Sequence, residues 1–390
     1  ATGRMSSEQP AKKQKVDTSE ASAAEGGAGG EAGMGAAADA DANAGAERRG
    51  NPTVADLIPA DRSGHSSTCT NTANSENISQ TISTDSAAPC CNWKMFAEDT
   101  ETRLDGHLGT VLALAESNGR VYSGGKDDSI RVWNRNTLEN ESVIEVEAAV
   151  WSMVIWKEWL VTGHDDGKVR LWNLTTEECD VALEGHEDGI NALAVCGELL
   201  ATGSDDRNIR IWSTSNANGT RSWRCKWTLQ GHRGLVACLE VWQGLVISGA
   251  WDDTIKVWDP VAGTHRKTLV GHTDTVMSLL VNRDRLLSAS QDGTVRMWGL
   301  GDANNWEALR TIQVYPTGSG QWVRCLASWD SVIVAGSFGP SDEGRRFELQ
   351  MWDGATLDRL RVVCLPEGQR VMVLAALGQA GLWGGVGEGW

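Results

Sequence analysis

From Trp93 onward, short apolar runs alternate with turns rich in Gly, Asp and Asn. The runs are five to seven residues long and rich in Val, Ile, Leu and Trp, which is typical of β-strands joined by tight turns. The first group predicts strands over residues 110–115, 121–125, 129–133 and 143–146, and later groups repeat this order. The pattern therefore predicts an all-β protein built from units of four strands.

A fixed interval runs through these units: a Gly-His pair occurs four times, and a Trp follows each His after 26 residues. The pairs are His107 and Trp133, His186 and Trp212, His232 and Trp258, and His272 and Trp298. Two more Trp residues, Trp172 and Trp352, close similar phrases that lack the Gly-His. Four strands repeated every 40 to 45 residues or so are the unit of a β-propeller.

At these motifs the chain resembles the WD-repeat (WD40) family. The resemblance rests on the Gly-His start, an Asp six residues before the closing Trp, and a Trp-Asp or Trp-Asn ending, and it covers residues 92–390. Propellers of this family commonly have seven blades, so the resemblance implies a seven-bladed WD40 β-propeller. Six blades are predicted to close at Trp133, Trp172, Trp212, Trp258, Trp298 and Trp352.

The seventh blade is predicted to be incomplete. Runs at 370–376 and 382–386 supply two inner strands, and the sequence stops at Trp390, where a third strand is expected to begin. The resemblance implies that residues 93–104 form the outer strand of the same blade and join the two ends of the ring. A gap is therefore expected between these strands, which favours a natural chain that continues past Trp390.

Residues 1–91 consist mainly of Ala, Gly, Ser, Thr, Glu and Asp, with hardly an aromatic residue. Such a segment cannot bury enough apolar surface to offset its conformational entropy, so a disordered, low-complexity tail is predicted. Within it, the basic run KKQK at residues 12–15 fits either a short nuclear-import signal or a solvated charge run. We therefore expect an intracellular protein, cytoplasmic or nuclear.

Charge and cysteine usage narrow the possible ligands. The formal net charge of −17 argues against nucleic acid, because phosphate binding needs clustered Lys and Arg. The nine Cys residues form no C-x2-C pair and have no His partners at zinc-ligand spacing, so neither a metal nor another cofactor is expected. No apolar run approaches the roughly 18 residues of a membrane helix, so no membrane association is expected.

Each of the four units that begin with a Gly-His pair carries a His, a hydroxyl residue and an Asp at constant offsets from its Trp. The sets are His107, Ser123, Asp127 and Trp133; His186, Thr202, Asp206 and Trp212; His232, Ser248, Asp252 and Trp258; His272, Ser288, Asp292 and Trp298; and, without a His, Thr162, Asp166 and Trp172. One set alone resembles a catalytic triad. Because an enzyme seldom needs four copies of one site, we interpret the sets as buried hydrogen-bond networks and predict no enzymatic activity.

The resemblance also implies which residues are exposed on one end of the ring, here called the top face. They lie three and five positions after the His and one position before the network Asp. The predicted partner-binding residues are Leu112, Lys126, Trp151, Asp165, Asn191, Asp205, Leu235, Trp251, Met277, Gln291, Trp322, Arg324 and Arg370. Aromatic residues and Arg are the usual anchors of protein interfaces, although some of these Trp residues could instead pack on neighbouring loops.

Two functions stay open from the sequence. The first is a non-catalytic scaffold that binds a peptide or protein on the top face within a multi-protein complex, with no small-molecule substrate. The alternative is a substrate-receptor subunit of a ubiquitin ligase. The chain lacks the leucine-rich pattern of an F-box, so that role would need a partner to supply the link.

Overall fold

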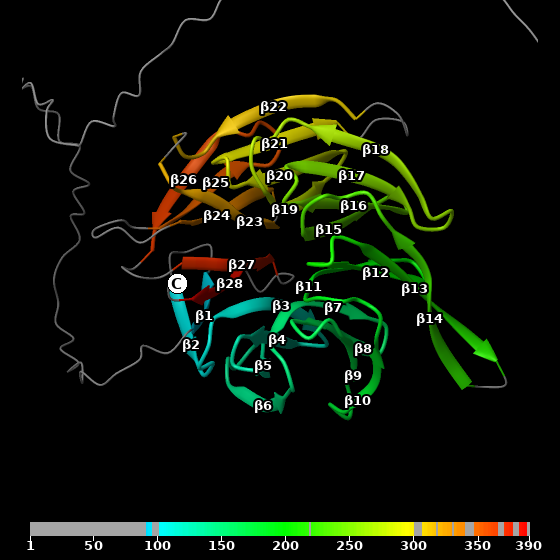
Figure 1. Cartoon of the computed structure of the whole chain (residues 1–390). Helices are drawn as coiled ribbons and strands as arrows, with labels where there is room; N and C mark the ends of the chain where they lie inside the picture. The colour runs from blue at the N-terminus through cyan, green and yellow to red at the C-terminus, as the bar shows by residue number, and fades with distance from the viewer. Residues whose placement is uncertain are drawn as a thin grey trace, which may run out of the picture. The chain divides into compact units, whose positions relative to one another are not determined.

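The computed structural model describes residues 91–95, 101–217, 220–299, 306–316, 319–329, 331–339, 347–365, 370–376 and 382–387. These residues form 28 strands and no helix, and they belong to one compact unit (Figure 1). Accordingly, no helix in this part of the chain could cross a membrane. The predicted tail, with its basic run at 12–15, lies outside the described residues except for Cys91, where the first strand begins.

Six of the sheets are blades of a β-propeller, each formed by four consecutive antiparallel strands. From the innermost strand outward, they are β3 (Val111–Ser117), β4 (Arg120–Gly125), β5 (Ser129–Asn134) and β6 (Asn140–Glu145); β7 (Val150–Trp156), β8 (Trp159–His164), β9 (Val169–Asn173) and β10 (Cys179–Leu183); β11 (Ile190–Cys196), β12 (Leu199–Ser204), β13 (Ile209–Ala217) and β14 (Thr220–Leu229); β15 (Val236–Trp242), β16 (Leu245–Ala250), β17 (Thr254–Asp259) and β18 (Thr264–Val270); β19 (Val276–Asn282), β20 (Arg285–Ser290), β21 (Thr294–Gly299) and β22 (Ala308–Gln313); β23 (Trp322–Trp329), β24 (Val332–Phe338), β25 (Glu348–Asp353) and β26 (Arg359–Cys364).

The remaining sheet joins strands from the two ends of the described chain, and we call it the composite sheet. In it, β27 (Arg370–Ala376) pairs with β28 (Leu382–Gly387), β28 with β1 (Cys91–Met95), and β1 with β2 (Glu101–Asp105), all antiparallel. The expectation of an incomplete last sheet is therefore wrong. The segment before the first Gly-His supplies two strands instead of one, and β1 occupies the place where a gap was expected.

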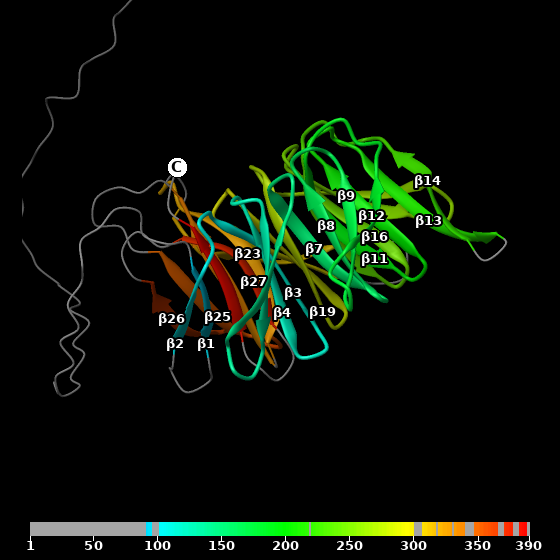
Figure 2. The ribbon, with the colours of Figure 1, turned by 90° about the horizontal axis from the view of Figure 1, so that it is seen from below.

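The innermost strands lie side by side around a central channel (Figure 1). Strands β3, β7, β11, β15, β19 and β23 contact one another in turn, and β27 contacts both β23 and β3. Most outer strands are short, but the hairpin of β13 and β14 extends beyond its neighbours in both views (Figures 1 and 2). This hairpin lies between Trp212 and Trp258, whose spacing of 46 residues exceeds the 40 residues from Trp172 to Trp212.

In six of the seven described sheets, a glycine in the second strand faces a β-branched residue of the next inner strand. A Cβ added at Gly249 would lie 2.6 Å from Cγ1 of Val276 and 2.7 Å from Sγ of Cys238, so no side chain fits there. The same contact occurs at Gly124 with Val150, Gly163 with Ile190, Gly203 with Val236, Gly336 with Val371, and Gly385 with Val111. The last of these pairs joins the composite sheet to the first sheet.

Candidate functional site

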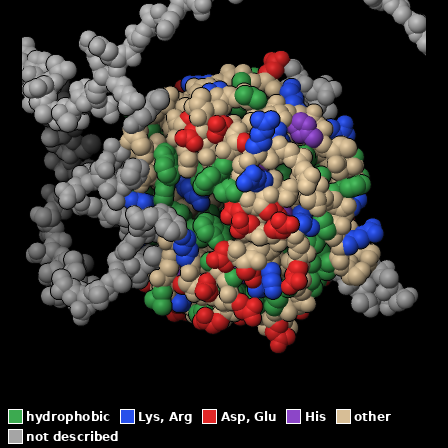
Figure 3. Space-filling view, in the orientation of Figure 1, with side chains coloured by type: hydrophobic (Ala, Val, Ile, Leu, Met, Phe, Trp, Pro, Cys, Tyr) green, Lys and Arg blue, Asp and Glu red, His purple; other side chains and the backbone are tan. Residues whose placement is uncertain are grey.

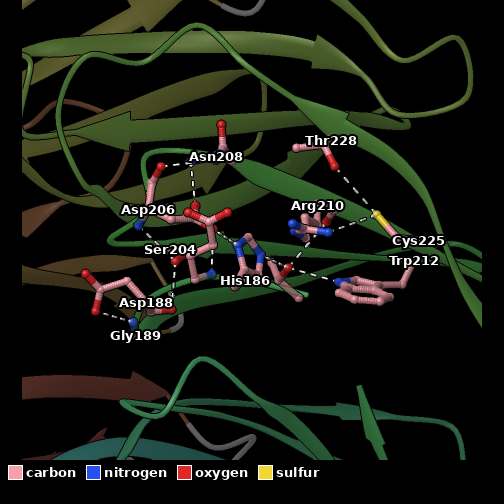
Figure 4. Close-up of polar contacts among 12 residues, drawn as sticks. His186, Asp188, Gly189, Ser204, Asp206, Asn208, Arg210, Trp212, Cys225 and Thr228 are labelled. Carbon is pink, nitrogen blue, oxygen red and sulfur yellow. Dashed lines mark hydrogen bonds and ion pairs between the residues drawn. The ribbon is translucent and has the colours of Figure 1, made fainter. Parts of the chain in front are cut away.

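The four predicted networks are present, and the sheet of β11 to β14 shows their geometry (Figure 4). His186 Nδ1 lies 2.7 Å from Asp206 Oδ2, and His186 Nε2 lies 2.7 Å from Thr202 Oγ1. Trp212 Nε1 donates to the same hydroxyl oxygen at 3.0 Å. An imidazole protonated at Nδ1 satisfies every partner, since it donates to the carboxylate and accepts from the hydroxyl.

The other three networks have the same bonds and nearly the same distances. They join His107, Asp127, Ser123 and Trp133; His232, Asp252, Ser248 and Trp258; and His272, Asp292, Ser288 and Trp298. Burial alone would raise the pKa of Asp206, but the bonds from His186 and two backbone N–H groups lower it to about 2. The Ser and Thr hydroxyls are fully buried and occupied by the indole, so these networks expose no nucleophile.

The second sheet has a network that the sequence analysis missed. His164 in β8 lies 2.7 Å from the Thr162 hydroxyl through Nε2 and contacts the Ala148 carbonyl at 3.0 Å through Nδ1, while Trp172 donates to the same hydroxyl. Burial lowers the pKa of His164 to about 4, so its imidazole is neutral. Asp166 is not part of this network, because its carboxylate pairs with Arg170 at 2.8 Å. The prediction that this sheet lacks the His is therefore wrong.

On the top face, residues from several sheets surround a cavity of about 240 Å³, here called the top-face cavity. Seven of its lining residues were predicted from the sequence, and the eighth is Ala237; they are Trp151, Asn191, Asp205, Leu235, Ala237, Trp251, Met277 and Arg324. A second cavity of about 230 Å³ fills the channel, shares five of these residues, and is lined by all seven inner strands. Figure 3 shows hydrophobic and basic side chains around a hollow near the centre of the ring.

The top-face cavity combines exposed aromatic surface with charges of both signs. Trp251 is 54% exposed, and the Lys126 ammonium lies over the Trp151 ring, 5.2 Å from its centroid. The Asn191 amide donates to the Asp205 carboxylate, although burial and the neighbouring acidic groups raise the pKa of Asp205 overall. Burial lowers the pKa of Arg324, and one of its terminal nitrogens contacts Met277 Sδ at 3.9 Å.

Several predicted partner-binding residues lie outside this cavity. Arg370 is only 3% exposed, because its guanidinium is sandwiched between the rings of Phe338 and Phe347 at 5.2 and 5.3 Å. Its prediction as a surface contact is therefore wrong. Trp322 packs against Phe338, with 5.4 Å between ring centroids. This agrees with the alternative that some of the predicted Trp residues pack against their neighbours.

The remaining predicted residues, Leu112, Lys126, Asp165 and Gln291, do not line the top-face cavity. Leu112 is buried in the wall of the channel. Gln291 and Asp165 stand in the tight turns after β20 and β8, where their backbone N–H groups bond to Thr275 and Ala149. Among the described residues, no group of three or more His, Cys, Asp or Glu could hold a metal ion.

A family model and a solved structure of known proteins match this architecture. The family model for the WD domain, G-beta repeat, matches residues 99–134, 144–173, 177–213, 223–259 and 263–299. A solved structure described as the RRP9 WD40 repeats superposes with a TM-score of 0.60 at 22% identity, covering 73% of this chain and 89% of that one. This likeness shows the fold.

Similarity to curated proteins is confined to short segments. The chain is 34% identical over 96 residues to zinc finger CCCH domain-containing protein 17 of Oryza sativa subsp. japonica, which is 24% of this chain and 22% of that protein. It is 32% identical over 96 residues to zinc finger CCCH domain-containing protein 63 of Arabidopsis thaliana, which is 24% of this chain and 21% of that protein. The chain thus spans about a fifth of the length of these relatives.

Proposed function

Because the chain belongs to the WD40-repeat family, whose propellers generally mediate protein–protein interactions, we propose that it is a non-catalytic scaffold that binds a peptide or protein segment in the top-face cavity. The observation that supports this proposal best is the convergence of Trp151, Trp251 and Arg324 on one cavity from three different sheets. Aromatic residues and Arg carry most of the binding energy in protein interfaces. An indole that is 54% exposed offers apolar surface whose burial by a partner is favourable.

Replacing Trp251 by Ala is expected to remove top-face partners, because it deletes the most exposed aromatic surface of the cavity. Truncation of a central aromatic anchor commonly costs about 2 kcal/mol or more, which is roughly a thirtyfold loss of affinity. The measurement is quantitative mass spectrometry of proteins that co-purify with the full chain. The matched control is Trp227→Ala, since Trp227 is 40% exposed but lies outside the cavity.

An identical set of partners for Trp251→Ala and the wild-type chain would contradict the proposal. Cullin components among the partners lost would support the ligase-receptor alternative. A general loss of partners with both variants would indicate a folding defect, which circular dichroism of the purified variants would reveal.

We also propose that the composite sheet is the seventh blade and closes the ring. Two contacts support this: β27 touches both β23 and β3, and Gly385 faces Val111 of the first sheet. A Cβ at position 385 would lie 2.7 Å from Val373 Cγ1 and 2.8 Å from Val111 Cγ1. The contact of Gly385 with Val111 is then equivalent to the glycine contacts between the other sheets.

If the ring is closed in this way, Gly385→Ala will lower the free energy of unfolding by about 1–3 kcal/mol, as overpacking of a core does. The matched control is Gly299→Ala, because a Cβ there would meet its nearest neighbour at an ordinary 3.4 Å. Urea denaturation followed by tryptophan fluorescence measures both variants. Equal stabilities for the two would argue against closure through this contact.

A further inference from the structure

Arg324 occupies the junction of the top-face cavity and the central channel, since it lines both. Its one hydrogen-bond contact among the described residues is the weak acceptor Met277 Sδ at 3.9 Å, and no described carboxylate forms an ion pair with it. Burial lowers its pKa, and the groups that oppose this effect are two thiols, those of Cys325 and Cys238. A partly buried cation without a carboxylate partner is costly, which suggests that a ligand supplies the partner.

A second cation lies nearby. Lys126 stands over the Trp151 ring, and its pKa is lowered first by burial and then by the charge of Arg324. The two positive charges therefore repel each other. Asp165 offsets part of this repulsion at Lys126 but forms no ion pair with Arg324 among the described residues. Together the two cations create a positive potential beside the Trp151 ring.

Asp205 is the acidic residue that lines the cavity, and it has its own partner. Asp205 accepts a bond from Asn191, and its pKa is raised by burial and by the charges of Asp188 and Asp206. Arg324 thus contributes a positive charge to the cavity lining, Asp205 contributes a negative one, and Lys126 lies beside the cavity over the Trp151 ring.

We propose that the top-face cavity anchors its ligand through the carboxylate of an Asp or Glu side chain of a peptide, bound between Arg324 and Lys126. This inference rests on the proposed function and adds the chemistry of the anchor. The planar guanidinium of Arg324 matches a carboxylate, and the rings of Trp151 and Trp251 cover the apolar part of the peptide. A phosphate would match the same two positive charges, so the test compares the two acidic groups directly.

The test uses an array of eight-residue peptides with mixed flanking positions and a fixed central residue. The fixed residue is Glu, Gln, phosphoserine or Lys, and the probe is the full chain. Glu-centred peptides are expected to bind about 10- to 100-fold more tightly than Gln-centred ones, the usual advantage of a hydrogen bond to a charged group. Arg324→Met should abolish this preference, whereas Arg324→Lys should retain part of it.

Matched variants separate the anchor from general effects of charge and folding. Lys126→Met is expected to weaken the binding of Glu-centred peptides and to leave the binding of the other peptides unchanged. Its control is Lys157→Met, because Lys157 also lies over a Trp ring, that of Trp156 at 5.5 Å, outside the cavity. Arg324→Met is expected to fold normally, since it removes a buried charge and keeps most of the side-chain volume. Thermal unfolding of each variant checks this expectation.

The outcomes distinguish the anchor from the site. Equal binding of Glu- and Gln-centred peptides, with both weakened by Trp251→Ala, would overturn the carboxylate anchor and leave the peptide site standing. Stronger binding of phosphoserine than of Glu would also overturn it, in favour of phosphate recognition. Binding that none of the cavity variants alters would overturn the proposed function itself.

Discussion

Replacing Ser248 by Ala is expected to lower the free energy of unfolding by about 3 kcal/mol, because it leaves two buried groups without a partner. The Ser248 hydroxyl lies 2.7 Å from His232 Nε2 and accepts a hydrogen bond from Trp258 Nε1 at 2.8 Å. Both rings are held inside the sheet, so water cannot replace the lost hydroxyl. Urea denaturation at pH 7 measures the loss.

Two further variants make this result specific. Ser248→Thr keeps the hydroxyl, as Thr202 does in the preceding sheet, and is expected to retain most of the stability. Ser222→Ala removes an exposed hydroxyl from the β13–β14 hairpin and should change stability by about 0.5 kcal/mol at most. The structural interpretation of the networks would fail if Ser248→Ala were as stable as Ser222→Ala.

Acid is expected to destabilise the propeller steeply between about pH 5 and pH 2. Burial alone would raise the pKa of the four network carboxylates, but hydrogen bonds from histidines and from backbone and hydroxyl groups lower it. The pKa of Asp127 and Asp206 falls to about 2, and the pKa of Asp252 and Asp292 is also lowered. A carboxylate whose pKa is lower in the folded state stabilises that state above its unfolded pKa of 3.8. This stabilisation is lost as the pH falls through the folded value, and it is about 2 kcal/mol for each of Asp127 and Asp206.

The variant Asp206→Asn tests this origin. It should be less stable than the wild-type chain at pH 7, and its stability should fall less steeply between pH 5 and pH 2, since one of the four carboxylates is gone. The exposed Asp358→Asn is the control and should retain the wild-type slope. Denaturation curves at several pH values measure the slopes. Identical slopes for Asp206→Asn and the wild-type chain would show that protonation of groups other than Asp206 causes the loss of stability in acid.

Local periodicity was enough to predict most of the fold. The closing Trp residues, the tight turns and the network side chains recur at fixed spacing, so each four-strand sheet could be located from its own segment. The pairing of β1 with β28 could not be found in this way, because strands almost 300 residues apart share no local pattern. The segment CNWKM of β1 alternates apolar and polar residues, as a strand does, but this alternation does not identify β28 as its partner.

The candidate site was predictable where the offsets of the repeat hold. Trp151 and Arg324 lie at corresponding places on two inner strands, Trp251 lies in the tight turn after β16, and the three meet at one cavity. Arg370 occupies the place that Trp322 has in the preceding sheet, but its environment depends on Phe338 of β24 and on Phe347, just before β25. His164 was missed because it stands where the other sheets have Gly, Ser or Ala, so the search for a Gly-His pair did not reach it.

The composite sheet also constrains when the chain can fold during its synthesis. Strands β1 and β2 end at Asp105, and their partner hairpin begins only at Arg370, which the ribosome adds 265 residues later. Strand β28 itself begins at Leu382, 287 residues after β1 ends at Met95, so at roughly 5–20 residues per second β1 waits about 14 to 57 seconds for it. During that interval the unpaired edge of β1 is open to strands of other nascent chains. We therefore expect exchange of β1 between neighbouring chains on one messenger RNA to be the characteristic misassembly of this protein.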